Sequence, residues 1–208
     1  MIDKWLSKSK FTTIVEKLAK RFFLNKISAN QITIIALVLG LTSALSIFLS
    51  RFLMWNIELI ICASILMFIS FLFDAIDGAI ARLEKPSVFG GILDIFCDRT
   101  VEVAIIISLI STDPLTLMWP GIFSLGTIIL CISMFLLIGG VIEENKLDEH
   151  EKVIYYHHGL MERSETFLFL FFITILFQFR FILLWIFAFL VFITAILRLR
   201  DAYLLLKS

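Results

Sequence analysis

The chain has 208 residues, of which 60% are hydrophobic and 17% are charged, and its mean hydropathy is +1.01. An ordinary soluble domain carries roughly 25% charged residues. The composition therefore excludes a water-soluble globular protein and, more firmly, a disordered chain. It predicts an all-α integral membrane protein. The 18 basic and 18 acidic residues cancel, so the net charge by itself says nothing about binding partners. We expect no nucleic-acid partner.

The first 26 residues predict an amphipathic helix that lies in the membrane interface. The basic region is too long for a secretory signal peptide, and the apolar stretch behind it has spanning length and no small-residue cleavage site. Lysines separate apolar residues that recur at helical spacing. These apolar residues are Ile2, Trp5, Leu6, Ile14, Val15, Leu18 and Phe22.

Six transmembrane helices are predicted in the rest of the chain. A hydrocarbon core of about 30 Å needs about 20 apolar residues per helix. The apolar region 166–197 would form a helix of about 48 Å, which is too long for one span. We therefore predict two short helices there, hinged near Arg180. No internal repeat or linker appears, so residues 1–208 form one domain, with a six-helix bundle over 27–208. The other four apolar stretches are 31–50, 52–73, 90–110 and 117–142.

The basic residues predict the orientation of this bundle. An even number of spans places both termini on one side, and that side receives all Lys and Arg residues except Arg51 and Arg180. The positive-inside rule makes this side the cytoplasm. Trp55, Trp119 and Trp185 fall near the outer helix ends, where an aromatic belt is expected. We expect a multi-pass protein of the plasma or inner membrane with cytoplasmic termini.

Four carboxylates lie where the second span ends and the third begins, on the predicted cytoplasmic side. Asp74 and Asp77 share one helix face, and Asp94 and Asp98 share another, with apolar residues between them. A solvated loop would have no reason to alternate in this way. One Asp at the centre of a membrane helix costs about 2.5 to 3.5 kcal/mol, so four of them need compensating cations or a water-filled cavity.

Facing carboxylates of this kind could hold two Mg²⁺ or Mn²⁺ ions, which favour hard oxygen ligands. Two such ions stabilise the attacking and leaving oxygens of an in-line phosphoryl displacement. The pattern thus indicates a diphosphate-containing substrate and a cytoplasmic active site. A cation or proton transporter is an alternative, although it would place carboxylates nearer mid-membrane. An intramembrane prenyltransferase and an inactive scaffold are further alternatives.

The residues that follow these carboxylates extend the pattern into a recognisable motif. The run is Asp74-x2-Asp77-Gly78-x2-Ala81-Arg82-x7-Gly90-x3-Asp94-x3-Asp98. It resembles the signature of the class I CDP-alcohol phosphatidyltransferase family, with a spacer of seven residues where eight is usual. Ser28 to Thr33 also resembles the start of that family's first transmembrane helix, with Ala29 where Pro is common. The family shares the six-helix architecture and the interfacial N-terminal helix.

The resemblance implies specific roles and a reaction. Asp74, Asp77 and Asp94 would be metal ligands, and Asp98 would be both a metal ligand and the general base. An acceptor hydroxyl would attack a CDP-linked lipid such as CDP-diacylglycerol and release CMP, in phospholipid biosynthesis. The resemblance also implies a homodimer. The implied CDP-alcohol contacts are Asn30, Gln31, Thr33, Gly78, Ala81, Arg82, Ser87 and Gly90.

The family resemblance does not determine the acceptor alcohol. Family members that accept inositol phosphate or glycerol 3-phosphate bind its phosphate through arginines that here match Arg163, Arg198 and Arg200. Residues 94–99 resemble the phosphatidylinositol-phosphate synthase branch. The alternatives are an unphosphorylated acceptor, a non-diacyl CDP-alcohol donor, or arginines that only obey the positive-inside rule. Glu102 continues the Asp98 face and either lines the acceptor pocket or pairs with a cation such as Arg99.

Overall fold

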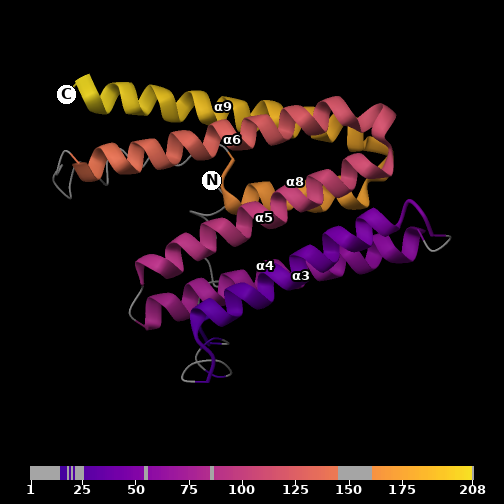
Figure 1. Ribbon diagram of the computed structural model, residues 1–208, viewed down its shortest axis with the longest axis horizontal. Coiled ribbons are helices and arrows are strands. Elements are labelled where there is room, and N and C mark those ends of the chain that lie inside the picture. The colour runs from indigo at the N-terminus through magenta and orange to yellow at the C-terminus, as the bar shows by residue number, and fades with distance from the viewer. Residues whose placement is uncertain are drawn as a thin grey trace.

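The described part of the computed structural model comprises residues 15–17, 19, 21, 26–53, 56–84, 87–144 and 161–207, and it consists of helices joined by short turns (Figure 1). No strand occurs within these ranges. The helices are α3 (Ala29–Leu49), α4 (Asn56–Leu83), α5 (Val88–Thr112), α6 (Pro114–Glu144), α8 (Arg163–Ile175), the 3-10 helix η2 (Phe177–Phe179) and α9 (Arg180–Lys207).

Four of these helices are long and apolar enough to cross a membrane, namely α3, α4, α6 and α9. The all-α membrane protein that the composition predicts is therefore confirmed. Helix α5 carries Asp94, Asp98, Arg99 and Glu102, and α8 has only 13 residues, so the count of six spans stays a prediction. The interfacial helix over 1–26 lies almost wholly outside the described residues, as does Trp55.

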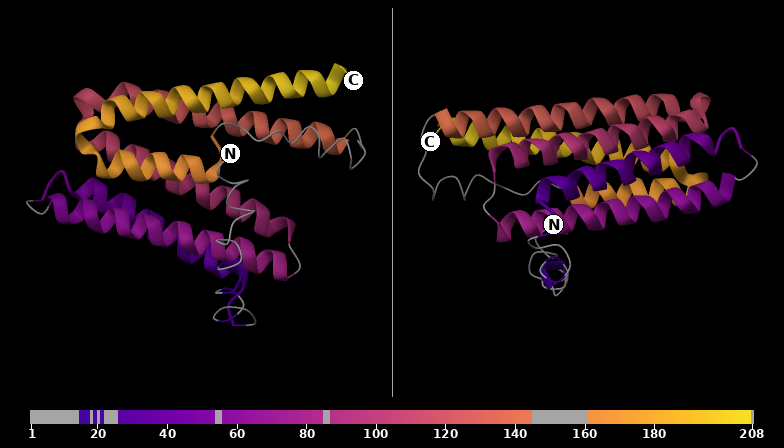
Figure 2. Two further views of the ribbon diagram at one scale, coloured as in Figure 1. Left: turned by 180° about the vertical axis from the view of Figure 1, so that it is seen from behind. Right: turned by 60° about the horizontal axis from the view of Figure 1, so that its bottom comes forward.

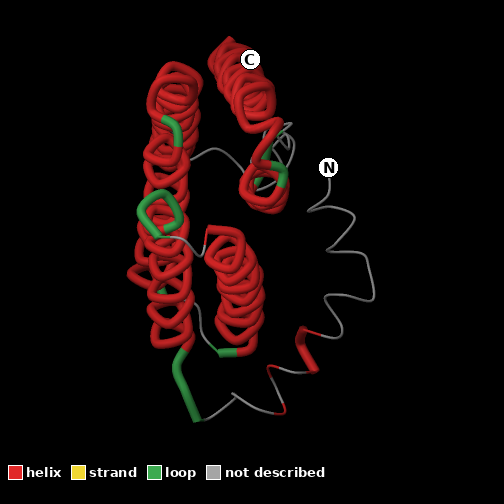
Figure 3. Tube along the Cα trace, turned by 90° about the vertical axis from the view of Figure 1, so that its right-hand side faces the viewer, coloured by secondary structure: helices red, strands yellow, loops and turns green. Residues whose placement is uncertain are grey.

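The helices form two layers of three, seen end-on in Figure 3. One layer contains α3, α5 and α6, and the other contains α4, α8 and α9. Across the layers α3 packs on α4 and α6 packs on α9, with α5 and α8 between these pairs in all views (Figure 2). Helices α4 and α5 both pack against α3 and α8, so the faces that carry the carboxylates lie opposite each other.

Apolar side chains fill the centre of the bundle and also cover its outside. Met67, Ile105, Leu170 and Phe187 are almost fully buried in one core cluster that joins α4, α5, α8 and α9. Many large apolar side chains on the outer faces are exposed, as Phe189 illustrates at 64%. An apolar surface of this extent fits lipid as the surrounding solvent.

Small residues and hydroxyls bring α3 close to its neighbours. The Ser43 hydroxyl donates to the Ala63 carbonyl at 2.7 Å, and the Ser70 hydroxyl donates to the Ala36 carbonyl at 2.7 Å. A Cβ at Gly40 would lie 2.6 Å from a Val101 methyl carbon, so only glycine fits this contact with α5. Small residues and cross-helix hydrogen bonds are the usual means of packing helices in lipid.

The chain turns between α8 and α9 immediately before Arg180, where the sequence predicts the hinge. The buried Arg180 guanidinium donates to the carbonyls of Ile173 at 3.1 Å and Thr174 at 2.9 Å, and to the Thr112 hydroxyl at 3.0 Å. These bonds satisfy carbonyls at the end of α8 and hold the turn without Gly or Pro. The second helix is not short, because α9 continues past residue 197 to Lys207.

Candidate functional site

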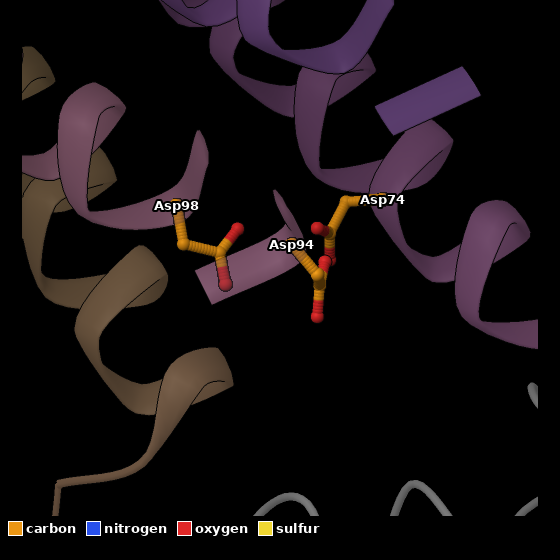
Figure 4. Close-up of side chains that lie close together, drawn as sticks. All are labelled: Asp74, Asp94 and Asp98. Atoms are coloured by element: carbon orange, nitrogen blue, oxygen red, sulfur yellow. The ribbon is translucent and has the colours of Figure 1, made fainter. Parts of the chain in front are cut away.

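Three carboxylates from two helices meet at one end of the bundle. Asp74 of α4 and Asp94 and Asp98 of α5 each place a carboxylate oxygen within 4.8 Å of the other two. Figure 4 shows these three side chains converging on the space between the helices. We call them the carboxylate cluster. Such a set of hard oxygen donors suits a divalent cation such as Mg²⁺ or Mn²⁺.

Asp77 lies one turn beyond Asp74 on α4 and stands outside this cluster of three. Its side chain is buried, and its Oδ2 atom has no hydrogen-bond partner among the described residues. A buried carboxylate oxygen without a partner is costly, and a cation would relieve that cost. The four carboxylates that the sequence singles out thus fit a divalent metal site, with Asp77 at its edge.

A cavity of about 290 Å³ adjoins the cluster and contains most of the predicted CDP contacts. Asp77 and Asp94 line it, so the cavity and the carboxylates share a wall. Its volume is close to the lower end of the range for small-molecule sites, roughly 300 Å³. The predicted contacts that line it are Asn30, Thr33, Gly78, Ala81, Ser87 and Gly90.

Two helices begin at this cavity, and their caps explain why. Ser28 is the N-cap of α3 and forms a capping box with Gln31, and Ser87 is the N-cap of α5 and accepts from the Gly90 amide at 3.0 Å. Serine at an N-cap satisfies an otherwise unpaired amide. The amino ends of helices carry partial positive charge and favour anions. The cavity is therefore suited to a phosphate group.

Gly90 is closely packed at the cavity wall, so that any larger residue would displace neighbouring side chains. A Cβ there would lie 2.9 Å from the Ser87 hydroxyl oxygen and 3.0 Å from the Asn30 amide oxygen. Gly78 is less constrained, since a Cβ there would meet only an Arg82 guanidinium nitrogen at 3.5 Å. The glycine of the motif therefore has a packing explanation at residue 90 but not at residue 78.

Two predicted CDP contacts are not among the described residues that line the cavity. The Gln31 side chain accepts from the Ser28 amide at 3.0 Å, so it acts in the helix cap. Arg82 is exposed, and its guanidinium reaches back along α4 to within 3.5 Å of the Cβ position of Gly78. It lies beside the cavity wall rather than in it.

Of the three predicted acceptor arginines, only Arg163 reaches the carboxylates. From the first position of α8 it forms ion pairs with Asp74, with Asp94 at 3.3 Å and with Asp98 at 2.5 Å. Arg198 donates to the Cys131 carbonyl at 2.9 Å and lies over the Phe135 ring. Arg200 is exposed and pairs with Asp201. His157 and His158, for which the sequence predicts a cytoplasmic loop at the membrane interface, lie outside the described residues.

A smaller cavity of about 70 Å³ lies on the other side of the cluster, deeper in the bundle. Asp98, Glu102 and Arg163 line it together with Ser70 and mainly apolar side chains. Glu102 is buried and also forms an ion pair with Arg99. The ion-pair alternative for Glu102 is therefore confirmed, and its place in an acceptor pocket stays a prediction. Ser70 was not predicted, although it precedes Asp74 by one helical turn on the same face.

Comparisons with known proteins agree with this geometry. Residues 26–195 match the family model described as CDP-alcohol phosphatidyltransferase. A phosphatidylinositol phosphate synthase from Corynebacterium glutamicum is 33% identical over 93 residues, which are 44% of this chain and 39% of that relative. The match thus spans well under half of the relative's length.

Two crystal structures of Mycobacterium tuberculosis phosphatidylinositol phosphate synthase have the same fold. One, with CDP-DAG bound, gives a TM-score of 0.65 at 21% identity and covers 94% of each chain. The other, in complex with manganese and citrate, gives a TM-score of 0.64 at 21% identity and covers 92% of this chain and 88% of that one.

Proposed function

Since the chain belongs to the CDP-alcohol phosphatidyltransferase family, we propose that it transfers the phosphoalcohol group of a CDP-linked lipid to an acceptor alcohol and releases CMP. The observation that carries the proposal is the shared wall between the carboxylate cluster and the 290 Å³ cavity. A diphosphate bound in that cavity would have its phosphorus atoms beside the carboxylates. The related mycobacterial structure with CDP-DAG bound supports CDP-diacylglycerol as the donor.

The donor side of the reaction is assigned to the larger cavity. The amino ends of α3 and α5 would stabilise the negative charge of the diphosphate, and Asn30 and Ser87 supply polar groups. Asp74, Asp77, Asp94 and Asp98 would hold two Mg²⁺ or Mn²⁺ ions, and the related structure with manganese supports this assignment. When bound, such ions neutralise charge on the diphosphate and on the departing CMP.

The acceptor side is assigned to the smaller cavity. Asp98 lines it and would remove the proton from the acceptor hydroxyl. The hydroxyl oxygen then forms a bond to the β-phosphorus of the donor, the bond from that phosphorus to the bridging oxygen breaks, and CMP leaves with that oxygen. Arg163 lines the same cavity and would bind a phosphate on the acceptor through paired N–H donors.

A phosphorylated alcohol is the proposed acceptor, either inositol phosphate or glycerol 3-phosphate. The similarity to phosphatidylinositol phosphate synthases supports the first of these. The placement of Arg163 beside Asp98 supports a phosphate next to the reacting hydroxyl. A cation transporter is less well supported, because Asp74 and Asp77 lie in the last third of α4 rather than at its centre.

The proposal includes the setting of the enzyme. The sequence places the carboxylate end of the bundle on the cytoplasmic side, because nearly all Lys and Arg residues fall there. At the opposite end, Arg51 donates to the Ser111 carbonyl at 2.8 Å, and Arg180 caps α8. Both outer arginines thus have structural partners, which supports this orientation. A homodimer is proposed from the family resemblance.

CMP release from CDP-diacylglycerol tests the proposed function. Purified protein with Mn²⁺ or Mg²⁺ should release CMP when inositol phosphate or glycerol 3-phosphate is added, and less with serine or unphosphorylated polyols. Asp98→Asn should lower the rate by roughly 10² to 10⁴ because the general base is lost. If no acceptor in this panel supports CMP release, the diacylglycerol version of the proposal is wrong.

A further inference from the structure

Arg163 and a divalent cation would use the same three carboxylates. The Arg163 guanidinium pairs with Asp74 from α4, and with Asp94 and Asp98 from α5. These are the same three side chains that form the carboxylate cluster, with oxygens within 4.8 Å of one another. The guanidinium and a metal ion cannot both occupy the space between these oxygens.

The two cations differ in what they offer the carboxylates. Three carboxylates at this spacing repel one another, and the guanidinium offsets one negative charge through a rigid, planar set of donors. A divalent ion brings twice the charge and binds carboxylate oxygens at about 2.0 to 2.6 Å. It can therefore replace the guanidinium, although it must first break the ion pairs that Arg163 makes.

We propose that Arg163 is an intramolecular competitor of the divalent cation, and that metal binding transfers its guanidinium from the carboxylates to the acceptor's phosphate. The smaller cavity, which Arg163 and Asp98 both line, supplies the place for that phosphate. Metal loading would thus create the acceptor site, and acceptor would bind after metal. The competition stands on the ion pairs alone, whereas the acceptor phosphate rests on the proposed function.

The backbone around Arg163 limits the change to its side chain. The Met161 amide donates to the Thr194 hydroxyl of α9 at 3.0 Å, and the Thr166 amide donates to the Glu162 carbonyl at 2.9 Å. The start of α8 is therefore held on both sides of Arg163. A rotamer change of a long side chain is enough to move its guanidinium from one partner to the other.

Mn²⁺ binding to Arg163→Gln tests the competition directly. The measurement is isothermal titration with Mn²⁺ alone, in detergent, without donor or acceptor. Removal of the competing cation should tighten Mn²⁺ binding by roughly tenfold, within the ordinary range for coupled ligands. In EDTA, Arg163→Gln should melt at a lower temperature than the unmodified chain. When Mn²⁺ is added, its melting temperature should rise by more than that of the unmodified chain.

A matched control and a second variant keep this test decisive. Arg51→Gln removes the same charge at the opposite end of the bundle and should leave Mn²⁺ affinity unchanged. Arg163→Lys keeps the charge without the paired donors and should bind Mn²⁺ more tightly than the unmodified chain, so it serves if Arg163→Gln does not fold. Equal or weaker Mn²⁺ binding in the Arg163 variants would overturn the competition.

Glycerol 3-phosphate binding tests the second half of the proposal. In the unmodified chain it should bind more tightly with Mn²⁺ than in EDTA, and by reciprocity it should tighten Mn²⁺ binding by the same factor. This coupling should be lost in Arg163→Gln. If the coupling is unchanged there, the transfer to phosphate is wrong. A different outcome separates the two proposals. If Arg163→Gln binds Mn²⁺ more tightly but the unmodified chain releases no CMP with any acceptor, the proposed function is wrong and the competition stands.

Discussion

Gly90 lines the larger cavity and Gly126 of α6 does not, which makes them a test of the cavity wall at the scale of one residue. A methyl group at residue 90 would press on Ser87 and Asn30, whereas at residue 126 it would meet nothing within 4 Å. Since misplacement of binding groups by about 1 Å can cost 10²-fold in rate, Gly90→Ala should lower kcat/KM for the donor by roughly tenfold or more. Gly126→Ala is the control and should stay within about twofold of the unmodified rate, since no contact changes. Similar rates for the two variants would argue against this cavity as the donor site.

At the scale of elements, the turn between α8 and α9 depends on one side chain. Arg180 is 8% exposed and donates to two carbonyls of α8 and to Thr112 at the end of α5. Arg180→Gln should lower the free energy of unfolding by at least about 2 kcal/mol, because buried carbonyls would lose their donors. Thermal unfolding in detergent measures this, with Arg200→Gln as the control. Arg200 is exposed on the same helix, so its loss should change stability by less than about 0.5 kcal/mol. Equal melting temperatures for both variants would show that Arg180 does not hold the turn.

At the scale of the whole molecule, the carboxylate cluster couples the two layers of the bundle. Asp74 belongs to the layer of α4, and Asp94 and Asp98 belong to the layer of α5. A cation bound between them should therefore stabilise the whole fold, by about 2.7 kcal/mol at a concentration 100 times its Kd. The expected result is a rise in melting temperature when Mn²⁺ replaces EDTA, and no such rise in the Asp74→Asn, Asp98→Asn double variant. Asp113→Asn changes an exposed Asp at the other end of α5 and should keep the full rise. A rise of the same size in the double variant would place the metal elsewhere.

The amino-acid sequence by itself determined the all-helical membrane class and the approximate helix positions, and it predicted that Asp74, Asp77, Asp94 and Asp98 face one another, of which all but Asp77 form the cluster. These follow from local rules, because apolar length sets a span and helical spacing sets a face. It also located the break before Arg180, although the guanidinium that explains the break binds residues distant along the chain.

Only the tertiary structure decided which predicted residues share a cavity. Asn30, Ser87 and Gly90 come together because two capped helices begin at the same place. Arg163 meets the carboxylates because α8 packs against both α4 and α5. Arg198 and Arg200 do not meet them, because Arg198 faces α6 and Arg200 lies exposed on α9. Contacts of this kind depend on how helices far apart in the sequence pack, and helical periodicity carries no information about that.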